Sequence, residues 1–365
     1  MTTTIPFTRI VKSLPDTVPF VGPETLERKQ GKPFAARIGA NESAFGISPL
    51  AQQALITAIG QQGCSWYGDP ENHAVRNLLS KKHAVASDSI CVDAGIDSLL
   101  GLTIRLFMEP GDTVVTSDGA YPTVNYHVNA FGGLLHKVPY REHHEDPEAL
   151  AQAAQRHKAR LVYLANPDNP MGTSLDVKAL QTLIDKLPAH CVLMLDEAYI
   201  EFMHSKQTLP LSLDDTRVVR FRTFSKAYGM AGMRMGYVLA HPHLIAGYNR
   251  IRNHFGVNRL AQIAAKASLQ DENFLGTVAG QVESGRQRIY QLANTLGLAC
   301  LTSDTNFVAV DLGSAERASQ LILKLAESGI FMRKPMVAPQ DTFIRIGVGT
   351  EQEHAILEKA MQKLL

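Results

Sequence analysis

Short apolar runs alternate with amphipathic stretches between about residue 90 and residue 240. The runs are rich in Val, Ile, Leu and Tyr, and they are continuous rather than alternating, which is typical of strands covered on both faces. Strands separated by helical patterns predict an α/β fold with a mainly parallel sheet. The expected strands are "SICVDAG", "DTVVTSD", "LLHKVPY", "RLVYLANP", "CVLMLDEAY", "RVVRFRTFS" and "MGYVLAH".

The predicted helices carry signals at their ends. In "SLLGLTIRLFMEPG" the leucines and Ile104 can share one broad apolar face, and Pro110-Gly111 stops the helix. In "TFIRIGVGTEQEHAILEKAMQKLL" a strand precedes a helix, and Thr350 with Glu353 three residues later forms a capping box at its start. The last hundred or so residues therefore predict a smaller α+β region.

The pattern suggests three parts. Residues 1–40 contain Pro15, Pro19, Pro23 and Pro33, and we expect an extended arm that packs on the smaller domain or on a partner subunit. Residues 41–255 are expected to form the large domain and residues 256–365 the small C-terminal domain.

Composition excludes several classes of protein. The 365 residues carry a net charge of +1, which does not favour nucleic acid or an anionic membrane as a partner. No apolar run is long enough for a membrane span, and the N-terminal stretch lacks the apolar core of a signal peptide. The four cysteines lie far apart, which predicts reduced thiols in the cytoplasm and no metal site. They are Cys64, Cys91, Cys191 and Cys300.

Candidate chemistry falls at the ends of three predicted strands, where open α/β sheets bind ligands. Asn169 follows "RLVYLA", Asp196 ends "LMLD" with Tyr199 three residues later, and Lys226 follows "VVRFRTF". A carboxylate that ends a buried strand needs a cation or a strong donor, and a protonated pyridine nitrogen is one. A lysine that can form an imine, an acid for a ring nitrogen and donors for a ring oxygen are what pyridoxal 5′-phosphate requires.

A phosphate cradle accompanies these residues. In "DAGIDSLL", Gly95 permits a tight turn before a predicted helix, and the amides at a helix start bind anions. Small residues surround Lys226 in "RTFSKAYGMAGMRMG", which leaves room for a ring and its phosphate. The remaining candidates are an aromatic platform, Tyr121, and the phosphate-binding residues Ile96, Asp97, Thr223, Ser225 and Arg234.

The ordered motifs "GANESAFGISP", "WYGDPE", "GIDSLL", "AYPTVNY", "NPDNPMG", "DEAYIEF", "TFSKAYGMAGMRMGY", "TNFV" and "RIGVGT" span nearly the whole chain. In this order the chain resembles the fold-type I, class I/II pyridoxal-phosphate-dependent aminotransferases, and most of all their histidinol-phosphate branch. The resemblance implies a homodimer that moves an amino group from an amino acid or amino-alcohol phosphate to a 2-oxo acid, in histidine biosynthesis.

The resemblance also implies roles for single residues. Lys226 would form the imine with the cofactor, Asp196 would pair with the ring nitrogen, and Tyr67 would reach the phosphate of the neighbouring subunit. The substrate side would consist of Arg345, which grips an anionic group, together with Arg333 and Asn41. The cofactor side would consist of Gly95, Ile96, Asp97, Tyr121, Asn169, Asp196, Tyr199, Thr223, Ser225, Lys226 and Arg234.

Departures from the family pattern lie on the substrate side. Phe20 replaces a tyrosine, Ser43-Ala44 replaces the usual "NP", and Gly256 replaces an asparagine in "HFGVNRLAQ". These differences leave the amino donor open.

Other interpretations stay open from sequence alone. A decarboxylase or other lyase on the same cofactor, similar to threonine-phosphate decarboxylases, would use the same cofactor residues. A sensor without catalysis would bind the cofactor and not turn over. Arg345 in isolation could form an ordinary ion pair, and Lys226 could be a surface lysine. The cluster "REHHEDPE" is expected to be a solvated loop that leads into a helix.

Overall fold

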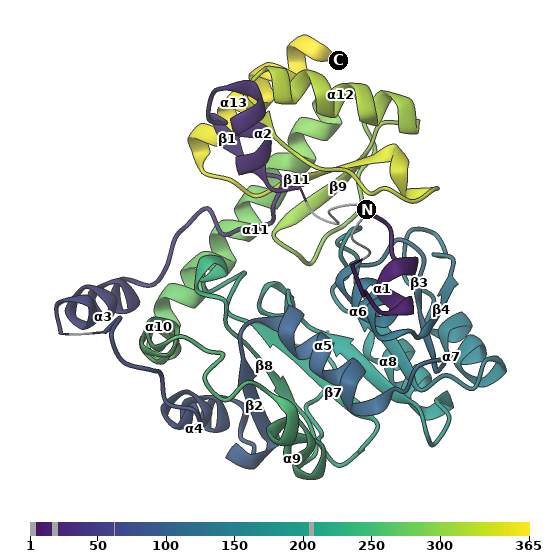
Figure 1. The fold of residues 1–365 in the computed structure, drawn as a ribbon. Coiled ribbons are helices and arrows are strands. Elements are labelled where there is room, and N and C mark those ends of the chain that lie inside the picture. Colours follow the sequence, from purple (N-terminus) through teal and green to yellow (C-terminus); the bar gives the residue numbers. More distant parts are fainter. Residues whose placement is uncertain (1–4, 17–20, 62, 204–207) are drawn as a thin grey trace.

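The computed structural model describes residues 5–16, 21–61, 63–203 and 208–365 (Figure 1). Phe20, one of the departures noted above, lies outside the described residues. In the ribbon, a large sheet with its helices lies below the C-terminal helices and strands. No helix within the described ranges is long and apolar enough to cross a membrane.

Seven strands of the described residues form one sheet in the order β2-β8-β7-β6-β5-β3-β4 (Figure 1). Neighbours from β7 to β4 pair in parallel, whereas β8 runs antiparallel to both β2 and β7. This arrangement confirms the predicted α/β fold with a mainly parallel sheet. Each apolar run predicted as a strand supplies one: β2 (Ile90–Asp93), β3 (Thr113–Ser117), β4 (Leu134–Val138), β5 (Leu161–Ala165), β6 (Val192–Asp196), β7 (Val218–Thr223) and β8 (Gly236–Leu239).

Successive residues of the central strands belong to opposite helix layers, as the twofold period of a strand requires. Tyr163 and Met194 lie in the apolar cluster shared with α5, α6 and α9, whereas Val162 and Leu193 lie in the cluster shared with α7 and α8. Coverage on both faces explains why the strands are continuously apolar. The helices are α5 (Ile96–Phe107), α6 (Thr123–Phe131), α9 (Pro242–Ile251), α7 (Pro147–Arg156) and α8 (Val177–Lys186).

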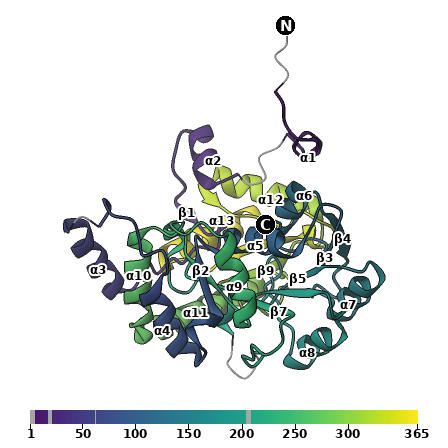
Figure 2. The same ribbon diagram turned by 60° about the horizontal axis from the view of Figure 1, so that its bottom comes forward.

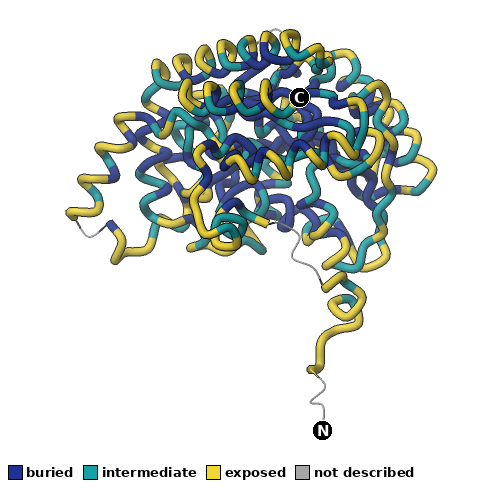
Figure 3. Tube along the Cα trace, turned by 90° about the horizontal axis from the view of Figure 1, so that it is seen from above, coloured by how far each residue is buried: buried dark blue, intermediate teal, exposed yellow. Residues whose placement is uncertain are grey.

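A third helical group covers the end of the sheet formed by β2 and β8. Ile90 and Tyr237 pack there with side chains of α3 (Pro49–Gly60), α4 (His73–His83) and α10 (Arg259–Leu269). This group lies on one side of the molecule and α7 with α8 on the other (Figure 2). Figure 3 shows the buried positions running through the middle of the molecule, with the outer turns of the helices exposed.

The C-terminal elements form a separate apolar cluster. β9 (Phe307–Asp311) pairs antiparallel with β11 (Phe343–Gly347), and α11 (Glu272–Thr295), α12 (Ala315–Glu327) and α13 (Glu351–Leu364) pack around them. The predicted capping box is confirmed: Thr350 Oγ1 accepts from the Glu353 amide at 3.2 Å, and Glu353 Oε2 accepts from the Thr350 amide at 2.8 Å.

The N-terminal segment is less extended than expected. It contains α1 (Arg9–Ser13), which contacts α6, and α2 (Pro23–Gln30), which starts at a proline whose missing N–H costs nothing at the first helical position. β1 (Ala36–Arg37) then pairs in parallel with β10 (Ile330–Phe331) of the C-terminal elements. The division of the chain at residues 40 and 255 stays a prediction.

The interpretation of "REHHEDPE" as a solvated loop is wrong for part of the cluster. Asp146 caps α7, and Glu145 is only 3% exposed. Glu145 accepts hydrogen bonds from Ser117 Oγ at 2.6 Å and from the Ala165 amide at 2.9 Å. Because both partners end strands of the sheet, Glu145 ties the loop to the sheet edge. Burial of Glu145 raises its carboxyl pKa well above the ordinary value.

Candidate active site

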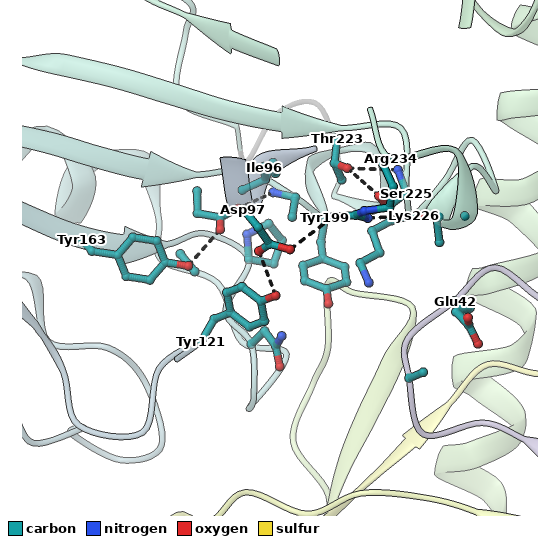
Figure 4. Close-up of a pocket in the computed structure, with 18 residues that line it drawn as sticks. Glu42, Ile96, Asp97, Tyr121, Tyr163, Tyr199, Thr223, Ser225, Lys226 and Arg234 are labelled. Atoms are coloured by element: carbon teal, nitrogen blue, oxygen red, sulfur yellow. Dashed lines mark hydrogen bonds and ion pairs between the residues drawn. The ribbon is translucent and has the colours of Figure 1, made fainter. Parts of the chain in front are cut away.

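A cavity of about 350 Å³ opens at the carboxyl ends of β5, β6 and β7, between the large sheet and the loop that follows β1 (Figure 4). Parallel strands end at the same edge of a sheet, so side chains far apart in the sequence meet there. Most of the predicted cofactor residues line this cavity: Ile96, Asp97, Tyr121, Asn169, Asp196, Tyr199, Thr223, Ser225, Lys226 and Arg234.

Lys226 projects into the cavity from the turn after β7 (Figure 4). Its Nζ donates to the backbone oxygen of Asn41 at 3.0 Å and lies 5.5 Å from the centroid of the Tyr199 ring. The partner of Lys226 is therefore a neutral carbonyl oxygen, which binds the Lys226 amino group less strongly than a carboxylate would.

Asp196 ends β6 and is 5% exposed. One carboxylate oxygen accepts from Tyr163 Oη at 2.8 Å, and the other accepts from the Ala198 amide at 2.9 Å. Burial raises the pKa of Asp196 to about 6, although these two hydrogen bonds act in the opposite direction. A cation beside this carboxylate would favour its charged form, which is the partner that a protonated ring nitrogen offers.

The start of α5 has the geometry that the predicted anion cradle requires. Gly95 is the N-cap with φ of 88°, and it has no side chain that could cap the helix amides. A Cβ at this position would lie 2.8 Å from Arg234 Nη2, so glycine permits the guanidinium to approach. Arg234 Nη2 also lies 3.3 Å from Asp97 Oδ2. Helix amides and a guanidinium at one point fit a phosphate group.

Two hydroxyls and an aromatic ring also line the cavity. Thr223 Oγ1 donates to Ser225 Oγ at 2.9 Å and accepts from the Ser225 amide at 3.0 Å. Tyr121 Oη donates to Asp97 Oδ1 at 3.1 Å, which holds the ring beside the start of α5 (Figure 4). Burial raises the pKa of Tyr121, so this hydroxyl stays protonated and remains a donor.

The predicted substrate residues lie around the cavity rather than on its lining. Arg345 donates to Asn169 Oδ1 through Nη1, and its buried Nε has no hydrogen-bond partner among the described residues. Asn41 Nδ2 donates to Tyr199 Oη at 3.1 Å, and Asn41 Oδ1 is likewise buried without a partner in the described part of the chain. Arg333 donates to the Val21 oxygen at 2.7 Å and forms a backbone bridge with Arg345.

Tyr67 does not line the cavity of its own chain. Its side chain is 79% exposed, and its ring centroid lies 4.9 Å from that of Phe255. The part that the resemblance assigns to Tyr67 concerns a neighbouring subunit and stays a prediction.

Sequence reasoning missed Tyr163 and Glu42, which both line the cavity. Tyr163 stands inside the apolar run "LVYLA", where a tyrosine is indistinguishable from an ordinary core residue, yet its hydroxyl reaches Asp196. Glu42 lies within the motif "GANESAFGISP", but nothing in that stretch singles it out from its neighbours.

Comparisons with known proteins identify the family of this chain. The Aminotransferase class I and II family model matches residues 37–364. A histidinol-phosphate aminotransferase from Moorella thermoacetica is 32% identical over 360 residues, which cover 97% of this chain and 92% of that protein. Histidinol-phosphate aminotransferase 2 of Hydrogenovibrio crunogenus is 34% identical over 347 residues, covering 93% and 91% of the two chains.

A solved structure extends the likeness to three dimensions. Histidinol-phosphate aminotransferase from Sinorhizobium meliloti, in complex with pyridoxal-5′-phosphate, superposes with a TM-score of 0.95 and 44% identity, covering 100% of this chain and 98% of the other. An aspartate aminotransferase from Thermus thermophilus, at 19% identity and a TM-score of 0.80, shares the fold. The chain therefore belongs to the class I and II aminotransferases and is a pyridoxal-phosphate-dependent enzyme of fold type I.

Proposed function

We propose that this aminotransferase takes the amino group of histidinol phosphate, or of a closely related donor, and passes it to a 2-oxo acid. The relatives named histidinol-phosphate aminotransferase cover nearly the whole chain, which supports this donor and a place in histidine biosynthesis. We infer further that the enzyme works in the cytoplasm.

The residues around the cavity suit pyridoxal phosphate. Lys226 would hold its aldehyde carbon, Asp196 its ring nitrogen, and Asn169 with Tyr199 its ring oxygen. When bound, the cofactor supplies an aldehyde for covalent attachment of amines and a ring that accepts an electron pair. Its ring would stack on Tyr121, and its phosphate would be held by Gly95, Ile96, Asp97, Thr223, Ser225 and Arg234.

The chain's own groups would then move protons and hold the donor. The Lys226 amine would take the proton from the donor Cα and return it one carbon away, as a general base and then a general acid. The Asp196 carboxylate would keep the ring nitrogen protonated. Arg345 would bind the donor's anionic group, because a planar guanidinium matches a carboxylate or phosphate. Arg333 and Asn41 would complete this side of the pocket.

One observation carries the proposal: Lys226, Asp196 and the start of α5 meet in a single cavity at the sheet edge. An amine, a buried carboxylate and an anion cradle in one place match the three separate demands of the cofactor. A surface lysine, a helix-capping aspartate and an ordinary arginine would have no reason to converge there.

We also propose a homodimer in which Tyr67 completes the site of the neighbouring subunit. Tyr67 is exposed, and so are its chain neighbour Trp66 and Phe255, whose ring centroid lies 4.9 Å from that of Tyr67. Large aromatic side chains gathered on a surface mark an interaction site.

The proposed reaction is tested by a half-reaction without an acceptor. We would mix the cofactor-loaded enzyme with histidinol phosphate and follow the absorbance of the bound cofactor. Rapid conversion from the aldehyde form to the amine form is expected. If other amino acids convert the cofactor and histidinol phosphate does not, the enzyme uses a different donor from the one proposed. With a donor that carries a carboxylate, such as histidine, carbon dioxide released in the absence of any acceptor would indicate decarboxylation instead of transamination.

A further inference from the structure

A short loop between β1 and α3 forms one wall of the cavity. Ala40 and Glu42 both line it, and Glu42 lies across the cavity from Tyr163 and Tyr121 (Figure 4). The predicted cofactor residues come from the large sheet and from α5, which follows β2. The loop with Ala40 and Glu42 therefore supplies a part of the cavity lining that the predicted cofactor residues do not.

Polar contacts hold the loop in place. Asn306, just before β9, donates through Nδ2 to the backbone oxygens of Asn41 and Glu42, each at 3.2 Å. Lys226 Nζ donates to the same Asn41 oxygen at 3.0 Å. Asn41 itself has a φ of 55°, a conformation that asparagine tolerates better than most residues. A side chain on a loop fixed in this way is positioned in advance of binding.

The Glu42 carboxylate is the least engaged of the three carboxylates on the described cavity lining. Asp97 accepts from Tyr121 and pairs with Arg234, and Asp196 accepts from Tyr163 and the Ala198 amide.

Glu42 has weaker contacts, because it meets Arg37 and Arg333 only through charge. Its Oε2 lies 3.8 Å from Arg37 Nη2, and the same Arg37 nitrogen lies 2.7 Å from Glu24 Oε1. The Glu42 side chain is 46% exposed, so it can turn toward a ligand without breaking a strong contact.

The charges around the cavity suggest which part of the donor meets Glu42. Arg345 and Arg333 suit the anionic group of the donor, and Lys226 its amino group. The side chain of the donor is left for the remaining wall, where a carboxylate favours N–H groups and cations and disfavours other carboxylates.

We propose that Glu42 is a specificity-determining residue that accepts a hydrogen bond from a nitrogen-bound proton on the donor's side chain. It would favour an imidazole ring over a phenyl ring and disfavour a side-chain carboxylate. This inference rests on the proposed function and refines its donor.

The test compares Glu42→Gln with the wild-type holoenzyme on two matched donor pairs, histidinol phosphate against phenylalaninol phosphate, and histidine against phenylalanine. A hydrogen bond to a charged group contributes more than one to a neutral group. We expect kcat/KM for the imidazole donor to fall about tenfold, mainly through KM, and kcat/KM for the phenyl donor to change less than about twofold. Glutamate, tried as a donor, should become a better substrate of the variant.

Glu24→Gln is the matched control, because it removes the closer partner of Arg37 without altering the cavity lining. In both donor pairs, Glu24→Gln should leave the ratio of kcat/KM for the imidazole donor to kcat/KM for the phenyl donor unchanged. An equal loss for imidazole and phenyl donors, or no loss for either, would overturn the role of Glu42. If the phosphate pair is not turned over but the amino-acid pair is, the proposed donor fails, and the imidazole-to-phenyl ratio of the second pair still decides the role of Glu42.

Discussion

Gly95 determines how closely Arg234 can approach the start of α5. We expect Gly95→Ala to weaken pyridoxal-phosphate binding at least tenfold, because the added Cβ would lie 2.8 Å from Arg234 Nη2. The dissociation constant can be measured by titrating the cofactor-free protein and following its fluorescence. Gly111→Ala is the control: its φ of 94° gives comparable backbone strain, but a Cβ there meets nothing within 4 Å. Equal affinities of the two variants would contradict the cradle.

Asp196 is a residue whose burial costs stability in the cofactor-free protein. Its pKa is about 6 in the folded state, above the value of about 3.9 for an unfolded aspartate. The folded state thus binds this proton more tightly, and the stability that the proton contributes below pH 4 is lost as the pH rises through 6.

We therefore expect cofactor-free Asp196→Asn to be more stable than the cofactor-free wild type at pH 8, by up to about 3 kcal/mol. The difference should shrink toward zero below pH 4, where both side chains are neutral. Urea unfolding at the two pH values measures it. With cofactor and substrates present, the same variant should lose most of its activity. A variant less stable than the wild type at pH 8 would contradict this account of Asp196.

At the scale of elements, α13 depends on its capping box, because Thr350 and Glu353 satisfy each other's backbone amides. We expect Thr350→Ala to lower the free energy of unfolding by about 1 kcal/mol. The urea midpoint should be compared at fixed protein and cofactor concentrations. Thr182→Ala, at a half-buried position in the middle of α8, is the control and should have little effect, since the Thr182 hydroxyl donates to the Lys178 oxygen of its own helix. Similar midpoints for both variants would argue against the cap.

The strands could be predicted from the sequence, but their arrangement could not. Each continuous apolar run became a strand, because burial on both faces leaves a signature in composition. The run "MGYVLAH" nevertheless carries no sign that β8 is antiparallel to its neighbours. The direction of a strand is set by the path of the connection that leads into it. Apolar residues are equally compatible with parallel and antiparallel pairing.

The sequence identifies those candidate site residues whose side chains are energetically unfavourable in ordinary packing. A buried Asp196 at a strand end and a lysine among small residues both contradict ordinary packing, so they stand out in the sequence. Tyr163 and Glu145 do not stand out. Tyrosine is common in apolar strands, and Glu145 looked like one more charge in a polar cluster until its partners, Ser117 and Ala165, were brought beside it by the fold.

At the scale of the whole molecule, the proposed exchange of Tyr67 between subunits can be tested by complementation. Lys226→Ala and Tyr67→Ala subunits should each form nearly inactive homodimers. In a mixed dimer, the Tyr67→Ala subunit keeps its own lysine and receives a tyrosine from its partner. Random reassortment of equal amounts should restore about a quarter of the wild-type activity, because half of the dimers would hold one intact site of two. No recovery above the parents would place Tyr67 in its own site or outside both.

The pairing of β1 with β10 has a consequence for synthesis. Ala36 pairs with Ile330, so β1, the first strand within the described residues, lacks its partner β10 until roughly 290 further residues have been made. At ribosomal rates of about 5 to 20 residues per second, the wait is roughly 15 to 60 seconds. The seven strands of the large sheet all precede residue 240 and can assemble during this time. A nascent chain in which this sheet has assembled would therefore still carry β1 without its partner strand.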